Sequence, residues 1–186
     1  MLSKIEDFGK NKGFFQYKKI GLLNSTPVQN TKTDVIDFDK TKEILYKGDR
    51  NQPKSCDALK LICEQNRLDF LELKSVENIV QYNNPIEESL EKIRFAIPRK
   101  IEGSKETMEL IVSHEGLALS KEEILEYTNC SKNFYLIVDR DISQKGLLTF
   151  SFNMLFNSAF RQIESENPII VKGLMEIDEE YQALDQ

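Results

Sequence analysis

The sequence predicts an α/β domain in which helices flank one mixed β-sheet. Two strand-like runs, 56–62 and 68–74, enclose a short polar segment and are typical of an antiparallel hairpin. A helical pattern of Ile and Leu follows from residue 84. The continuous apolar run 134–138 has the composition of a strand that is buried on both faces. Strands and helices in this order favour helical layers around one sheet.

A chain of 186 residues suits a single domain. No long Gly-, Ser- or Pro-rich linker divides it. We expect an N-terminal extension over residues 1–33, a core over 34–177 and an acidic tail over 178–186 that frays.

The helix starts carry recognisable signals. Asn84 suits an N-cap and Pro85 the first helical position, whereas Pro98 predicts that this helix ends or kinks. Ser120 and Glu123 form a capping box, which predicts another helix start. We also expect an extended segment over 34–46 and a last strand over 168–177. Two further helices are expected over 105–113 and 150–165.

The composition excludes several classes of function. Lys and Arg number 25 against 31 Asp and Glu, so the net charge of −6 argues against coating nucleic acid by overall charge, although a local basic cleft stays open. His114 is the only histidine and the cysteines number three, which disfavours a Cys/His zinc site and histidine-based hydrolysis. The basic residues Arg94, Arg99, Lys100 and Lys105 are interpreted as a solvated helix face.

Nothing in the sequence indicates a membrane protein. It holds no apolar run of about 18 residues or more, and the N-terminus lacks the apolar region of a signal peptide. We therefore expect a cytoplasmic protein with no membrane partner.

The hairpin places chemistry-bearing side chains together. If residues 63–66 form the turn, Asp57 lies opposite Glu72, and strand alternation puts Lys74 on the same face. Directly opposed residues have Cβ atoms about 4.5–5.5 Å apart, so the two carboxylates repel each other unless a cation or a shared proton compensates. Besides Lys74, a hard divalent ion such as Mg²⁺ (or Mn²⁺) suits this oxygen-rich site, with Asp57 and Glu72 as its ligands.

Asp57 followed by Glu72-Leu73-Lys74 resembles the signature of the PD-(D/E)XK nuclease superfamily. The resemblance implies a restriction-endonuclease-like core in which Asp57 and Glu72 bind Mg²⁺ and Lys74 is the catalytic residue that positions the attacking water. Cys56 stands where the family often has Pro. The family often has an upstream helical Glu, for which Glu6 and Glu43 are both candidates.

Three functional hypotheses follow. The first is a Mg²⁺-dependent phosphodiesterase that acts on DNA or RNA bound in a local cleft. The second is a non-catalytic binding or assembly protein built on the same core, with a protein partner or a second copy of the chain. The third is an unrelated α/β domain without a metal, in which the three charged residues form a surface ion-pair cluster.

Overall fold

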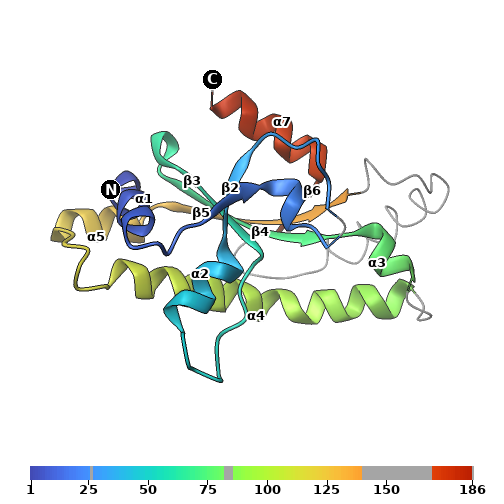
Figure 1. Ribbon diagram of the computed structural model, residues 1–186, viewed down its shortest axis with the longest axis horizontal. Coiled ribbons are helices and arrows are strands. Elements are labelled where there is room, and N and C mark those ends of the chain that lie inside the picture. Colours follow the sequence, from blue (N-terminus) through green and yellow to red (C-terminus); the bar gives the residue numbers. More distant parts are fainter. Residues whose placement is uncertain (26, 82–85, 140–168, 186) are drawn as a thin grey trace.

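The computed structural model describes residues 1–25, 27–81, 86–139 and 169–185, and these residues form one mixed β-sheet with helices on both faces (Figure 1). The sheet orders its six strands as they occur along the chain. Neighbours are antiparallel from the first strand to the fourth, and the last two strands join in parallel. The predicted α/β fold class is therefore confirmed.

The strands are β1 (Tyr17–Lys19), β2 (Asp34–Asp37), β3 (Ala58–Ile62), β4 (Arg67–Lys74), β5 (Ser131–Val138) and β6 (Ile169–Gly173). The helices are α1 (Leu2–Asn11), α2 (Phe38–Leu45), α3 (Val76–Gln81), α4 (Ile86–Val112), α5 (Lys121–Thr128) and α7 (Leu174–Leu184). Within the described ranges, the short 3₁₀ helices are η1 (Ile20–Leu23) and η2 (Cys63–Gln65).

The sheet separates two apolar layers. One face packs against α1, α2 and the long α4, with Phe70 and Phe134 stacked at its centre at a ring distance of 4.9 Å. The other face packs against η1 and α7, where Tyr181 is fully buried. Figure 1 shows α4 crossing one side of the sheet and α7 lying on the opposite side.

The predicted hairpin register is confirmed. Ile62 pairs with Arg67 and Ala58 with Leu71, so residues 63–66 form the turn. Asn66 closes it in the left-handed conformation, with φ of 47°. The predicted central strand is also confirmed, because β5 lies between β4 and β6 and buries alternate side chains on both faces.

The helix does not end at Pro98, one of the two outcomes expected there, since α4 runs from Ile86 to Val112 and absorbs the separate helix predicted over 105–113. Proline removes one backbone hydrogen bond from a helix interior. Here one apolar stripe continues on both sides of Pro98 and is buried against the sheet, through Leu90, Ile97, Ile101 and Met108. Tertiary packing of such a stripe supplies most of the stability of a helix in a protein.

Two segments expected to be extended turn into helices part-way. Within 34–46, the chain leaves β2 at Asp37, whose side chain accepts a hydrogen bond from the Lys40 amide at 3.0 Å and caps α2. Within 168–177, β6 ends at Gly173 and α7 begins. The expected fraying tail over 178–186 is wrong for the described residues, because α7 continues to Leu184 and is anchored by Tyr181.

The segment expected as an N-terminal extension belongs to the sheet and its core. Leu2, Ile5 and Phe8 of α1 are buried, and β1 pairs with β2. The helix predicted over 150–165 lies outside the described residues.

Gly103 lets the segment before β3 lie directly on α4. A Cβ atom at this position would stand 2.0 Å from the Lys54 carbonyl oxygen and 2.9 Å from the Pro53 side chain. At the next position, the Ser104 hydroxyl accepts a hydrogen bond from the Cys56 amide at 2.8 Å. These contacts fix the chain immediately before Asp57.

Gly103→Ala should therefore destabilise the protein by about 1–3 kcal/mol, because the methyl group meets backbone rather than a movable side chain. Chemical denaturation measures the free energy of unfolding. Glu102→Ala is the matched control, since this neighbouring side chain is exposed and its loss should change stability by at most about 0.5 kcal/mol. Equal effects of the two substitutions would contradict the packing argument.

Candidate functional site

The three side chains singled out by the sequence meet at one edge of the sheet. Asp57 directly precedes β3, whereas Glu72 and Lys74 lie at the end of β4. Because β3 and β4 are antiparallel, the start of one strand lies beside the end of the other. Glu72 lies on the same face of β4 as Leu68 and Phe70, and α4 packs against that face. The helix therefore covers the three side chains.

Two ammonium groups compensate the two carboxylates. Lys74 Nζ donates to Glu72 Oε1 from the same strand. Lys100 of α4 donates to both oxygens of Glu72 at 2.7 Å and approaches Asp57 Oδ1 at 3.3 Å. Lys100 therefore bridges the two acids, and the cluster consists of two carboxylates and two ammonium groups.

Asp57 is held in place by the backbone of the opposite strand. Its Oδ2 accepts a hydrogen bond from the Leu73 amide at 2.7 Å, while its Oδ1 faces Lys100. The carboxylate is therefore tied to the residue between Glu72 and Lys74. This bond fixes the spacing of the acids before any ligand binds.

Burial makes Glu72 the critical charge. Only 4% of this residue is exposed, and burial together with repulsion from Asp57 raises the pKa of its carboxyl above the ordinary value. Lys74 and Lys100 oppose that rise through their attraction for the carboxylate. Burial disfavours the charged form of Lys100, but attraction to Asp57 and Glu72 outweighs this and raises its pKa.

Lys100 is the site residue that the sequence analysis missed. Its interpretation as part of a solvated face is wrong, because its ammonium points into the carboxylate pair rather than into solvent. The sequence does contain an indication of this role. Lys100 stands three residues after Ile97 and one before Ile101, and both of these side chains are buried. A lysine beside the buried stripe of a helix needs an acidic partner across the interface.

Cys56 is a neighbour of the site but is not one of its proposed metal ligands. It is 3% exposed, and burial, together with the nearby Glu72 charge, raises the pKa of its thiol to about 12. The thiol is therefore protonated at neutral pH. Cys56 belongs to the buried apolar cluster on the face of the sheet that α4 covers.

Both candidates for an upstream glutamate make their contacts away from the cluster. Glu6 accepts hydrogen bonds from Tyr17 and Cys63, which places it at the turn end of the hairpin, the opposite end of β3 from Asp57. Glu43 forms an exposed pair with Lys40 on α2.

The donor set fits an open Mg²⁺ or Mn²⁺ site rather than a closed one. Among the described residues, no group of three or more His, Cys, Asp or Glu side chains is arranged to hold a metal. Mg²⁺ typically needs only one or two carboxylates, with water and substrate phosphate completing the shell. Asp57 and Glu72 supply two such carboxylates, and both are oriented by hydrogen bonds.

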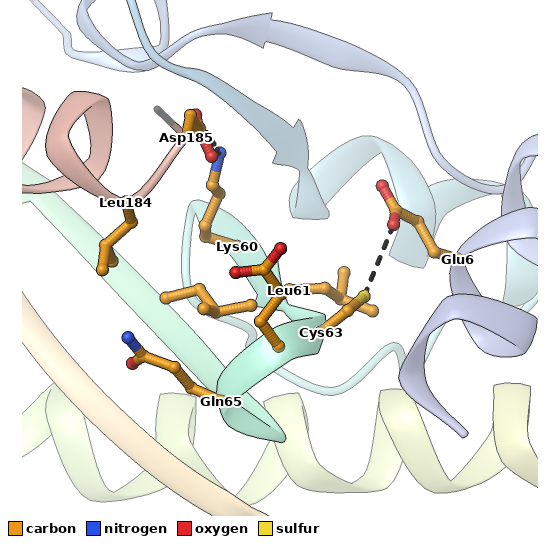
Figure 2. Close-up of a pocket in the computed structure, with 9 residues that line it drawn as sticks. Glu6, Lys60, Leu61, Cys63, Gln65, Leu184 and Asp185 are labelled. Carbon is orange, nitrogen blue, oxygen red and sulfur yellow. Dashed lines mark hydrogen bonds and ion pairs between the residues drawn. The ribbon is translucent and has the colours of Figure 1, made fainter.

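A separate hollow of about 570 Å³ lies at the other end of the hairpin (Figure 2). Glu6, Lys60, Cys63 and Asp185 contribute to its wall. Lys60 pairs with Asp185 at 3.1 Å, and the Cys63 thiol contacts Glu6 at 3.7 Å, so these side chains are engaged with one another. None of the predicted site residues lines it.

The chain matches no protein-family model, and neither a characterised protein nor a solved structure matches it. In the described part of the chain, no helix is both long and apolar enough to cross a membrane.

A double-mutant cycle tests the energetic link between α4 and β4. Lys100→Met should destabilise the protein by about 3–5 kcal/mol, because the buried Glu72 charge loses a partner. Glu72→Gln in the same chain should recover part of this loss, with an interaction energy of about 0.5–3 kcal/mol measured by denaturation.

The control cycle pairs Glu72→Gln with Lys105→Met. Lys105 lies on the same helix, with its ammonium 5.6 Å from the centre of the Phe134 ring. These two substitutions should be additive within about 0.5 kcal/mol. If the effects of Lys100→Met and Glu72→Gln are additive as well, the ion pair between Lys100 and Glu72 contributes no interaction energy to stability.

Proposed function

We propose that the protein is a Mg²⁺-dependent phosphodiesterase of the PD-(D/E)XK type that cleaves DNA or RNA. The observation that carries the proposal is the convergence of Asp57, Glu72 and Lys74 at one edge of the sheet, with Asp57 directly before β3 and the other two at the end of β4. Their joint fixation by backbone pairing and by α4 supports a preorganised site rather than a chance cluster of surface charges.

Each side chain has a role that its chemistry allows. Asp57 and Glu72 would hold the cation, which polarises a phosphate and lowers the pKa of bound water. Lys74 presents an ammonium beside Glu72, where it can position water and stabilise negative charge that develops on the phosphoryl oxygens. The Leu73 amide keeps Asp57 aligned with Glu72.

One observation favours the second candidate, a non-catalytic binding or assembly protein. Lys100 and Lys74 already balance the charges of Asp57 and Glu72, so the cluster is electrically neutral without a metal. A neutral, internally bonded cluster stabilises a fold without performing chemistry. The acidic net charge of −6 points the same way.

Cleavage assays separate the two candidates. Incubation of the protein with plasmid DNA, single-stranded DNA and RNA oligonucleotides should give products with Mg²⁺ or Mn²⁺ and none with EDTA. Asp57→Asn, Glu72→Gln and Lys74→Ala should each lower the cleavage rate about a hundredfold or more, because each removes a group that acts on the transition state.

Glu64→Gln is the matched control, since this carboxylate lies in the turn at the far end of the hairpin. It should cleave at the wild-type rate. Absence of divalent-dependent cleavage of all three substrates by the folded wild-type protein would overturn the nuclease proposal and favour the binding protein.

A further inference from the structure

The ammonium of Lys100 occupies the position between the two carboxylates. Its Nζ lies 2.7 Å from each Glu72 oxygen and 3.3 Å from Asp57 Oδ1. A divalent ion shared by Asp57 and Glu72 must approach these same oxygens. Two cations cannot make these contacts at once, because they would repel each other at close range in a buried setting.

The origin of the two lysines distinguishes them. Lys74 belongs to β4 and, among the described residues, pairs with Glu72 and not with Asp57. Lys100 comes from α4 and contacts both acids. Its four-carbon side chain can change rotamer without moving the backbone of β3 or β4.

We propose that Lys100 is an internal cation that competes with the divalent ion for Asp57 and Glu72, and that metal binding releases it from the pair. The inference rests on the proposed metal site and adds its regulation. In the metal-free protein Lys100 stabilises the buried acids. Because the metal must displace Lys100, the protein binds the metal more weakly than it would without this lysine. The contact between α4 and the two acids therefore depends on whether metal is bound.

Removal of the competitor should therefore strengthen metal binding. Lys100→Met keeps the length of the side chain and removes its charge. By isothermal titration calorimetry, this variant should bind Mn²⁺ with a dissociation constant at least about tenfold lower than that of the wild type, within the usual range of coupling between two binding events. Lys105→Met, on the same helix, should bind Mn²⁺ as the wild type does.

A measurement on the wild-type protein covers the case in which Lys100→Met does not fold. Lysine acetylation by an activated ester, followed by mass spectrometry, reports how accessible each amine is. Saturation with Mg²⁺ should raise the modification rate of Lys100 at least severalfold and leave that of Lys105 unchanged.

The outcomes separate this inference from the proposed function. Equal Mn²⁺ affinities of the wild type and Lys100→Met, or metal binding with no change in Lys100 modification, would overturn the competition and leave the metal site standing. Failure of both proteins to bind Mn²⁺ would overturn the metal site and the competition together. Tighter binding by Lys100→Met without nucleic-acid cleavage would support the competition and contradict the nuclease.

Discussion

The candidate site depends on compensating the buried negative charge of Glu72. Glu72 lies on the same face of β4 as Leu68 and Phe70, beside a cluster of buried apolar side chains. A charge in such a place is costly unless it is paired and hydrogen-bonded. Lys74 and Lys100 meet that need, and Lys100 can do so only if α4 passes over this edge of the sheet.

The packing of α4 against the segment before β3 follows from the same requirement. Gly103 admits the backbone near Lys54, and Ser104 receives the Cys56 amide. Both contacts lie within one turn or so of Lys100, so the helix that compensates Glu72 also positions Asp57. A single helix thereby contacts two acids, one directly before β3 and the other on β4.

The sequence was sufficient to predict the hairpin and the three motif residues. Strand side chains alternate with a period of two, and a slip by one residue would turn Leu59 and Leu61 away from the core, so the register was well determined. The polar segment over 63–66 then set the turn. The apolar run in β5 was equally clear, because a strand buried on both faces has no polar alternation.

Other features depended on contacts that the sequence does not display. Continuity of α4 through Pro98 reflects packing of one long stripe on the sheet, which outweighs a local helix breaker. The acidic segment of α7 looked unstructured, yet Asp178 accepts hydrogen bonds from the backbone of Thr33 and Tyr181 donates to the buried Asp69. Lys100 was missed for the same reason, since its partners lie 28 and 43 residues away in sequence.

We propose that Asp57 and Glu72 form a cation site at the edge of the sheet. A crystal structure of the protein soaked in Mn²⁺, with data collected for anomalous scattering, tests it most directly. We expect a manganese peak bonded to oxygens of both Asp57 and Glu72, with the Lys100 ammonium displaced from between them. A map without such a peak, in which Lys100 still bridges the two carboxylates at saturating Mn²⁺, would contradict it.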